Sequence, residues 1–288
     1  MKFTVISRAI KSNETLSITA LCTIGDVSRS GFYAWDKRPV AILSEIDVLI
    51  ETIFLESNRK SGYRTIMMAL ERQHKLVVNH KKILRSMRIQ GLVTQIRKKR
   101  NPFVSSEKSG TERAFPNHVE RAFSPSSPDL IYSADMTEFR INTGSKVYLY
   151  AAKDLCTKEI VAFNISSSPD AELVTETLEG ALELLSEAVR KRLIYHTDQG
   201  SVFMSDIHMS MTQRLQVTQS MSRRGNCLDN APIESFFGHL KDEIDVSSCK
   251  NLKEAILIIE RYIQKYNHER PQWALDRKTP AECRGLYN

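Results

Sequence analysis

Apolar residues recur every three or four positions along residues 41–100, and this period predicts amphipathic helices. A first apolar stripe is formed by Ile46, Leu49, Ile50, Ile53 and Phe54. A second helix is expected over residues 63–73, and a third over residues 80–89, with Asn79 as its cap. The apolar residues of the third helix that should face inward are Ile83, Leu84 and Met87. Three short helices in this order predict a helix-turn-helix unit.

Two segments with other patterns flank this unit. Residues 1–40 contain a candidate short helix over residues 17–22, a turn at Gly25 and a second helix from Val27, which is compatible with a small helix-turn-helix-like segment. Residues 101–128 are rich in Ser, Pro, Gly and charged residues and lack periodicity, which is typical of a linker.

From residue 129 the pattern predicts strands that alternate with helices. The expected elements, in order, are strands over residues 130–138, 146–153 and 159–165, a helix capped by Ser168 and continuing through Val189, a strand over residues 193–197, a helix over residues 202–214, a strand over residues 216–220 and a long helix from about Ala231. This order indicates an α/β fold, a mixed sheet with helices on its faces, as in a ribonuclease H-like core. Residues 129–288 are therefore assigned to one domain with a C-terminal helical tail.

The net charge of +7 is unevenly distributed along the 288 residues. From Arg59 to Arg100 thirteen Lys or Arg stand against one acid, Glu71, so this stretch carries +12 and the rest of the chain sums to −5. A basic helical segment beside an acidic body favours binding to nucleic acid over a merely solvated helix face. The residues of this segment that we expect to contact DNA are Lys81, Lys82, Arg85, Arg88, Arg97, Lys98, Lys99 and Arg100.

Composition argues against membrane and secreted proteins. No stretch approaches the roughly 18 apolar residues that span a bilayer, and the N-terminus lacks the apolar run and cleavage site of a signal peptide. The five cysteines are odd in number and lack zinc-knuckle spacing, so we expect free thiols. These features predict a cytoplasmic protein that is not associated with a membrane.

Three acidic residues on three expected elements could form a metal site. Asp135 lies in the first strand, Asp198 ends the fourth, and Glu234 lies in the long helix, with 35 residues between the last two. Ligands gather at strand ends in open α/β sheets, so these side chains can converge. Magnesium prefers oxygen ligands, and two metal ions about 3.5–4 Å apart promote in-line displacement at phosphorus.

Four motifs around these acids resemble the catalytic core of DDE transposases. They are Asp-Met-Thr-Glu at residues 135–138, His-Thr-Asp-Gln-Gly-Ser at 196–201, Ser-Met-Ser-Arg-Arg-Gly-Asn-Cys-Leu-Asp-Asn-Ala at 220–231 and Glu-Ser-Phe-Phe at 234–237. More narrowly, the chain resembles the second open reading frame product of the insertion-sequence-three family, which is related to retroviral integrases. Further matches lie at residues 28–33, 61–92 and 266–282, so the resemblance spans nearly the whole chain.

The resemblance implies a transposase that cuts DNA at insertion-sequence ends and joins those ends to another strand. Asp135, Asp198 and Glu234 would then be the catalytic and metal-binding triad, with two Mg²⁺ ions per site and Mn²⁺ as a substitute. The implied partners are transposon-end and target DNA. Two ends must be joined in one event, so the working complex is expected to be at least a dimer. Members of this family are often fused to the product of an upstream frame, which is a further expected partner.

Some residues near the acids admit two interpretations. Lys241 lies seven residues after Glu234 on the same helical face, where it would contact DNA or pair with a nearby acid. Arg223 and Arg224 lie before the long helix in a loop that would contact DNA or form a solvated turn. His196 shares a strand face with Asp198, so it would tune the site or be a packed histidine. Residues expected to lie off the site or to have structural roles are Glu138, Asp154, Asn267 and Arg270.

Two other functions stay open at this point. A ribonuclease H-type nuclease would only hydrolyse, but that class typically uses an Asp-Glu-Asp-Asp set rather than the 35-residue Asp-to-Glu spacing seen in this chain. A catalytically inactive DNA-binding regulator derived from a transposase would need only the basic segment. The three intact acids argue against such decay.

Overall fold

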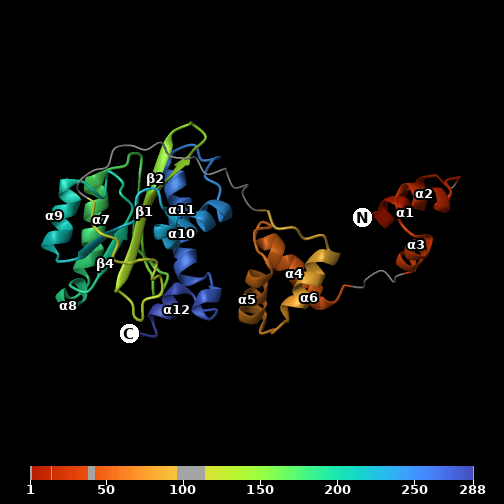
Figure 1. The fold of residues 1–288 in the computed structure, drawn as a ribbon, viewed down its shortest axis with the longest axis horizontal. Coiled ribbons are helices and arrows are strands. Elements are labelled where there is room, and N and C mark those ends of the chain that lie inside the picture. Colours follow the sequence, from red (N-terminus) through yellow and green to blue (C-terminus); the bar gives the residue numbers. More distant parts are fainter. Residues whose placement is uncertain (1, 14, 38–42, 96–113, 288) are drawn as a thin grey trace.

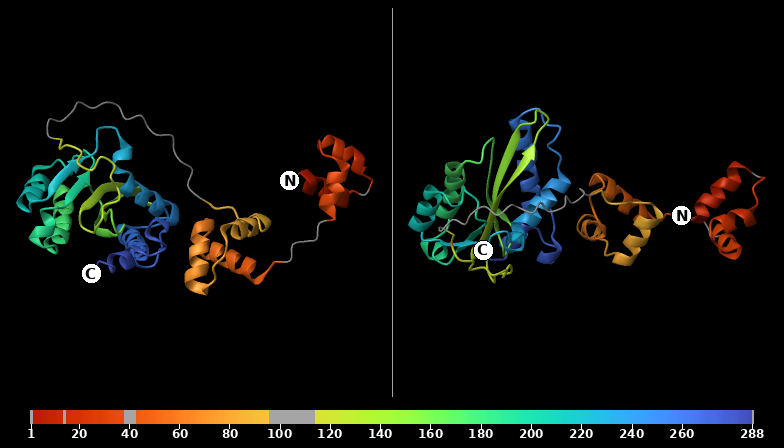
Figure 2. Two further views of the ribbon diagram at one scale, coloured as in Figure 1. Left: turned by 60° about the horizontal axis from the view of Figure 1, so that its bottom comes forward. Right: turned by 45° about the horizontal axis from the view of Figure 1, so that its top comes forward.

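The computed structural model describes residues 2–13, 15–37, 43–95 and 114–287. Figures 1 and 2 show these residues as three successive units in a row. The first unit contains α1 (Lys2–Ser12), α2 (Ile18–Ile24) and α3 (Arg29–Asp36). Ser17 and Ser28 cap the last two helices by accepting hydrogen bonds from backbone N–H groups, and Ile6, Cys22 and Phe32 are buried between the helices. The apolar pattern predicts the second and third helices but not α1.

The second unit contains α4 (Glu45–Glu56), α5 (Tyr63–His74) and α6 (His80–Ile89). Asn79 caps α6 as predicted, because its side chain accepts the Lys81 N–H. The prediction for Leu84 is wrong, since this side chain is 38% exposed. Ile83, Ser86 and Met87 face inward instead, and the turn of about 100° per residue directs Leu84 away from them.

The third unit is built on a five-stranded mixed sheet, as predicted, with the strand order β3-β2-β1-β4-β5. Its strands are β1 (Ile131–Arg140), β2 (Lys146–Asp154), β3 (Ile160–Ser166), β4 (Ile194–Thr197) and β5 (Thr218–Met221). The first three strands are antiparallel, and β4 and β5 run parallel to β1.

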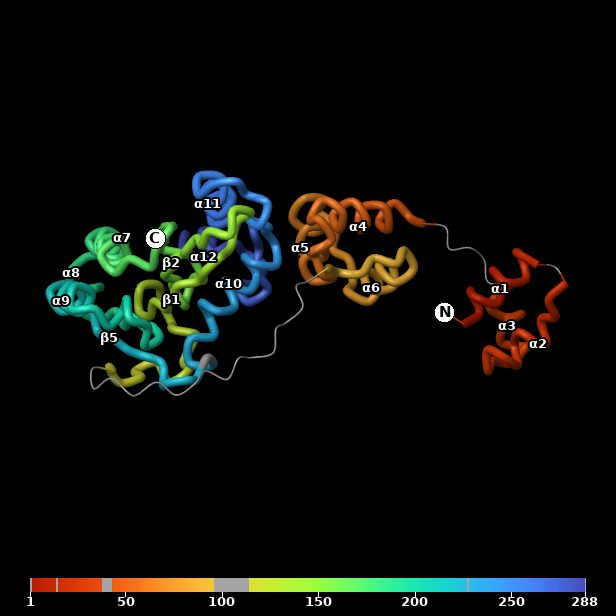
Figure 3. Tube along the Cα trace, turned by 90° about the horizontal axis from the view of Figure 1, so that it is seen from above, coloured from red at the N-terminus to blue at the C-terminus, as the bar shows by residue number. Residues whose placement is uncertain are grey.

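Helices cover both faces of this sheet (Figure 3). One face is covered by α7 (Ala171–Glu183) and α9 (Asp206–Arg214), and the other by α10 (Ala231–Glu243) and α11 (Leu252–His268). Successive side chains of β2 point to opposite faces and contribute to two separate apolar cores. Leu149 and Ala151 pack with α10 and α11, whereas Tyr150 and Ala152 pack with α7 and α9. The remaining short helices are α8 (Glu187–Arg190), η1 (Cys227–Asn230), η2 (Trp273–Leu275) and α12 (Pro280–Arg284).

Three helix boundaries differ from the prediction. Asp170, rather than Ser168, caps α7, because its carboxylate accepts the N–H groups of Glu172 and Leu173. That helix ends at Glu183, and Val189 falls in the separate α8 that Ser186 caps. The helix expected from residue 202 begins only at residue 206, after a turn.

The linker predicted over residues 101–128 does not extend that far. Val119 is 2% exposed and packs against Ile131 and Leu155. The His118 N–H donates to Ser220 Oγ on β5 at 2.9 Å. Residues 114–128 therefore belong to the sheet domain, and residues 101–113 of the predicted linker lie outside the described part of the chain.

Polar contacts hold the C-terminal segment to the sheet, as expected for Asp154, Asn267 and Arg270. The Asn267 amide exchanges two hydrogen bonds with the backbone of Ile160, each 3.0 Å long. Arg270 pairs with Glu243 on α10 at 2.8 Å. Asp154 is fully buried and accepts a hydrogen bond from Arg284 on α12, which also pairs with Asp129 and Glu159.

Two ion pairs join α5 of the second unit to this C-terminal segment. Arg72 forms a two-pronged pair with Glu282, at 2.6 and 3.0 Å, and Arg277 pairs with Glu71 at 2.8 Å. All four side chains are partly exposed, so each pair contributes at most about 1 kcal/mol to this contact. None of the described helices is long and apolar enough to cross a membrane.

Candidate active site

Asp135 lies in the middle of β1, on the face that α10 covers. It stands opposite Ala151 of β2, and directly opposite residues in an antiparallel pair share a face. Ala151 belongs to the core that α10 and α11 close, so Asp135 points toward those helices. The carboxylate is half-buried and accepts the N–H of Met136 at 2.7 Å.

Asp198 follows the last residue of β4. This strand is the parallel neighbour of the central strand, β1. Its Oδ1 accepts the N–H of Gly200 at 2.9 Å. A Cβ at position 200 would lie 2.8 Å from this oxygen, so a side chain there would displace the carboxylate from its present position. The Asp-Gln-Gly sequence thus holds the carboxylate at the strand end.

Glu234 lies in the first turn of α10, exposed beside a cavity of about 250 Å³. Asp135, Thr137 and Lys241 also line this cavity. Lys241 donates a hydrogen bond to Thr137 Oγ1, and its ammonium lies 5.1 Å from the centre of the Phe139 ring. The structure therefore brings Lys241 to the same cavity as Asp135 and Glu234.

Burial raises the pKa of all three carboxyls, and charges of neighbouring carboxylates add to the shift at Asp135 and Glu234. Burial, followed by the charges of Asp198 and Glu234, raises the pKa of Asp135 to about 7, although the Met136 N–H and Lys241 oppose the shift. Burial also raises the pKa of Asp198. Burial and then the Asp198 charge raise the pKa of Glu234. A cation between these groups would relieve both their desolvation and their repulsion.

The donor set fits a hard divalent cation, because all three side chains offer carboxylate oxygens. Among the residues that the structure describes, however, no three His, Cys, Asp or Glu side chains are grouped closely enough to hold a metal ion. Each aspartate accepts a hydrogen bond from a nearby backbone N–H, that of Met136 for Asp135 and that of Gly200 for Asp198. A carboxylate has two oxygens with about four lone-pair sites, so each aspartate can keep this hydrogen bond and still bind a cation.

Arg223 has a local partner that the sequence pattern did not reveal. Its guanidinium pairs with both oxygens of Asp229, at 2.8 and 2.9 Å, and Arg121 binds the same carboxylate at 2.9 Å. The Asp229 side chain is fully buried, and these hydrogen bonds, led by Arg223, hold its pKa well below the usual range. Arg224 is exposed in the same loop.

His196 is a packed histidine with three hydrogen-bond partners, one of which is the Ser222 hydroxyl, 3.2 Å from Nε2. Its ring is 1% exposed, with Nδ1 2.9 Å from Ser220 Oγ and Nε2 2.9 Å from the carbonyl oxygen of Asp229. Glu138 lies off the site and pairs with Lys146 at 2.8 Å. The sequence flagged His196 by its proximity to Asp198, but nothing in it indicated the contact with Asp229.

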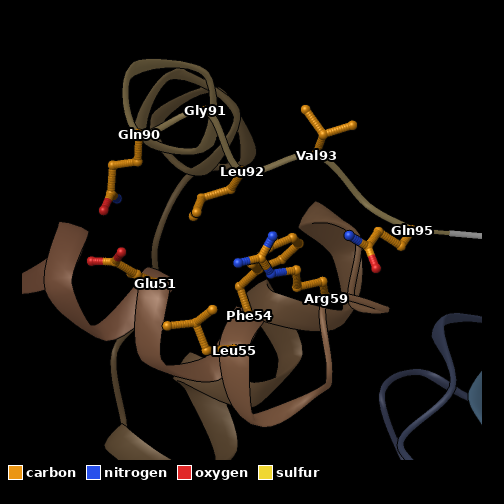
Figure 4. A pocket seen from close by; sticks show the side chains of 9 residues that line it. All are labelled: Glu51, Phe54, Leu55, Arg59, Gln90, Gly91, Leu92, Val93 and Gln95. Carbon is orange, nitrogen blue, oxygen red and sulfur yellow. The ribbon is translucent and has the colours of Figure 1, made fainter.

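The basic side chains predicted to contact DNA divide into two groups. Lys81, Lys82, Arg85 and Arg88 are all exposed on α6, opposite its buried side. Arg97, Lys98, Lys99 and Arg100 lie outside the described residues. A cavity of about 340 Å³ lies in the same unit, and Figure 4 shows the residues that line it, among them Phe54, Arg59 and Leu92. None of the predicted site residues is among those that line it.

Comparisons with known protein families match three stretches of the chain. An integrase core domain family matches residues 125–227, and a second integrase core domain family matches residues 215–280. The first match contains Asp135 and Asp198, and the second contains Glu234. An HTH-like domain family matches residues 44–100, which include α4, α5 and α6.

Curated relatives of the chain come from bacterial insertion sequences. The chain is 33% identical over 271 residues to InsK of Escherichia coli strain K12, named as a transposase for insertion sequence element IS150, and the match covers 92% of each chain. It is 30% identical over 249 residues to InsF, the transposase for insertion sequence IS3A of the same strain, with 84% of this chain and 83% of InsF covered.

Solved structures with a related chain path include a retroviral integrase. The catalytic core domain of the HTLV-2 integrase, determined in complex with magnesium, matches 55% of this chain and 98% of its own length. The sequence identity is 15% and the TM-score is 0.41.

Proposed function

The chain belongs to the insertion-sequence-three family of DDE transposases, and we propose that its reaction takes place at Asp135, Asp198 and Glu234. The protein is a polynucleotidyl transferase that acts on DNA at insertion-sequence ends. The observation that carries the site assignment is that Asp135 and Glu234 line one cavity and that burial, with the charges of Asp198 and Glu234, raises the pKa of Asp135 to about 7.

The integrase core implies dependence on a divalent metal. We propose two Mg²⁺ ions, with Mn²⁺ as a substitute, held by the three carboxylates. Such ions activate the attacking oxygen and stabilise charge on the phosphate. The protein's own contribution is to hold Asp135 on β1, Asp198 after β4 and Glu234 on α10. We propose that Lys241, which lines the cavity, binds a DNA phosphate through its ammonium.

DNA binding follows from the HTH-like domain and the integrase core. We propose that α6 contacts the transposon end through Lys81, Lys82, Arg85 and Arg88, and that the predicted basic run at residues 97–100 adds phosphate contacts. In the loop before α10, we propose Arg224 as the DNA contact. On α10 itself, we propose Lys241. Arg223 has a smaller part in that proposal, because its guanidinium already binds Asp229.

We propose that the working complex contains at least two copies of the chain, because two DNA ends are joined in one event. The product of an upstream frame, fused or bound, is proposed as a further partner. Sedimentation of the protein with and without paired end DNA tests the first proposal. Comparison of the chain with its fused form in the assay below tests the second.

Labelled DNA from the element's own ends tests the site. Wild type, Glu234→Gln, Asp135→Asn and Asp198→Asn are compared for cleavage and strand transfer with Mg²⁺ or Mn²⁺. Glu138→Gln is the matched control, because it makes the same chemical change on β1 in a side chain that pairs with Lys146. Each triad variant should lose more than the roughly 10–100-fold typical of residues that only hold a metal ligand in place, and the control should stay active.

The outcomes separate the candidate functions. Metal-dependent joining by wild type but not by the triad variants supports the proposal. Cleavage without joining, by the chain and by its fused form, would instead identify a nuclease. Binding to end DNA without any chemistry in either form would identify a regulator.

A further inference from the structure

Asn230 ties the start of α10 to β1 beside Asp135. The side chain is 2% exposed and makes two hydrogen bonds to neighbouring residues of β1. Its Oδ1 accepts the Ser133 hydroxyl at 2.6 Å, and its Nδ2 donates to the carbonyl oxygen of Ala134 at 3.1 Å. Asn230 directly precedes α10, and Glu234 lies four residues later. A single amide thus connects the elements that carry two of the three acids.

His196 lies on β4, close to Asp198, and connects this strand to Asp229, the residue before Asn230. The carbonyl oxygen of Asp229 can only accept, so His196 Nε2 carries the hydrogen and donates to it. Nδ1 then accepts from the hydroxyl of Ser220 on β5, and that hydroxyl oxygen accepts the His118 N–H. The imidazole is therefore fixed at both nitrogens, two residues before Asp198.

The residue pair Asp229–Asn230 is also held from the outer side. The Asp229 carboxylate is bound by Arg223 and Arg121, and by the Asn117 amide at 3.3 Å. The backbone oxygen of Asp229 accepts a hydrogen bond from His196, and the Asn230 side chain donates one to β1. This short segment is thus the meeting point of β1, β4 and α10.

We propose that Asn230 and His196 are positioning residues that fix the elements carrying Asp135, Asp198 and Glu234 relative to one another. The inference rests on the function proposed above. Metal coordination tolerates deviations of only about 0.2 Å in ligand distance, so small relative movements of the three elements weaken binding. Each tether lies within four residues of the acid that it positions.

Substitutions that change single hydrogen-bonding groups can break these tethers selectively. Asn230→Asp replaces the donor amide by a carboxylate oxygen that faces the carbonyl of Ala134. His196→Asn removes the donor at the Nε2 position, whereas the longer His196→Gln retains an amide N–H there and should rescue. Ser133→Ala is a milder variant that removes one hydrogen bond to Asn230.

His208 provides a matched control for a merely structural effect. It is a fully buried histidine of the same domain, on α9, and contacts Thr175 through Nδ1 at 3.1 Å. His208→Asn and His208→Gln should lower stability without touching the segment at Asp229. Positioning and stability are therefore measured as two separate quantities.

Electron paramagnetic resonance of free and bound Mn²⁺ gives the metal affinity of the full chain without DNA. Urea unfolding gives its stability. Asn230→Asp and His196→Asn should weaken Mn²⁺ binding by about 10-fold or more. Ser133→Ala should shift the affinity in the same direction by less. His196→Gln should remain close to wild type, and both His208 variants should bind Mn²⁺ as wild type does although they unfold more readily.

Asp198→Asn separates failure of this inference from failure of the proposed site. If Asp198→Asn loses Mn²⁺ binding while Asn230→Asp, His196→Asn and Ser133→Ala all retain it, the positioning roles are overturned and the site stands. If Asp198→Asn binds as wild type does, or wild type does not bind, both proposals fall. A loss of affinity in the His208 variants as large as in His196→Asn would also overturn the inference, because it would show a general effect of stability.

Discussion

Acidification should destabilise the sheet domain through His208. The imidazole is fully buried between the rings of Tyr195 and Phe203, whose centres lie 5.6 and 5.7 Å away. Nδ1 contacts the Thr175 hydroxyl, and Nε2 has no hydrogen-bond partner in the described part of the protein. Burial lowers the pKa of His208 from 6.5 to about 4, because the charged ring would lose its hydration.

The sign and size of the effect follow from this shift in pKa. Between pH 6.5 and about 4 the unfolded chain binds a proton at His208 that the folded chain does not bind. The stability contributed by the neutral ring is therefore complete above pH 6.5 and is lost as the pH falls toward the folded pKa. One pKa unit corresponds to about 1.4 kcal/mol, so the full loss is about 3 kcal/mol.

Urea unfolding of wild type and His208→Met, from about pH 7 to about pH 4, measures this contribution. Methionine fills a similar apolar volume and does not titrate. Other titrating groups act equally in both proteins and cancel in the difference between their unfolding free energies. That difference should move by about 3 kcal/mol in favour of the variant as the pH falls. Parallel pH profiles for the two proteins would refute the reasoning, because they would mean that the ring becomes charged without cost.

Two further predictions concern charged side chains. Arg284→Met leaves the carboxylates around it unpaired and should lower the free energy of unfolding in urea by about 3–5 kcal/mol. Arg214→Met removes an exposed ion pair and should lower it by less than about 1 kcal/mol. Equal losses of stability in the two variants would contradict the role of burial. Lys241→Ala should weaken binding of end DNA, and fluorescence anisotropy should show that the slope of log affinity against log salt concentration falls by about one. Lys253→Ala, which changes an exposed lysine on α11, is the control and should leave the slope unchanged. An unchanged slope in Lys241→Ala would exclude a phosphate contact.

Elements whose own side chains determine their boundaries were predictable from sequence. The third helix of the basic unit begins at His80 and ends at Ile89 as expected, because Asn79 caps it and Ile83 and Met87 share its buried side. The strands of the mixed sheet and their order with the helices were also predicted, since alternation along each strand reflects its two buried faces. Local pattern and tertiary structure agree at these places.

Segments held by contacts to distant residues were not predictable in this way. Residues 114–128 look like a linker because they have no periodicity, yet Val119 is buried by residues of β1 and of the turn after β2. The helix expected to continue through Val189 breaks because Ser186 caps a new turn, although apolar spacing continues across the break. A polar residue that can cap thus overrides an apolar pattern that could continue.

The candidate site shows the same division. The three acids stood out in the sequence because their motifs have a recognisable chemistry and spacing. The contacts of Asn230, His196 and Arg223 span between six and almost a hundred residues of sequence, and none follows from helical or strand periodicity. Sequence reasoning therefore found the groups expected to bind metal but not the groups that hold their elements in place.

The helix α10 couples these two kinds of residue. Its buried side includes Ile233 and Phe236, neither of which is exposed, and Phe236 packs edge-on against Tyr266 with ring centres 4.8 Å apart. Glu234 lies between these two core residues in sequence and faces the cavity instead. Any shift of the helix that relaxes its core packing therefore also moves Glu234 relative to the strand-borne aspartates. The polar contacts at Asp229 and Asn230 oppose such a shift at the end of the helix where Glu234 lies, so geometry at the site depends on them as well as on the apolar core.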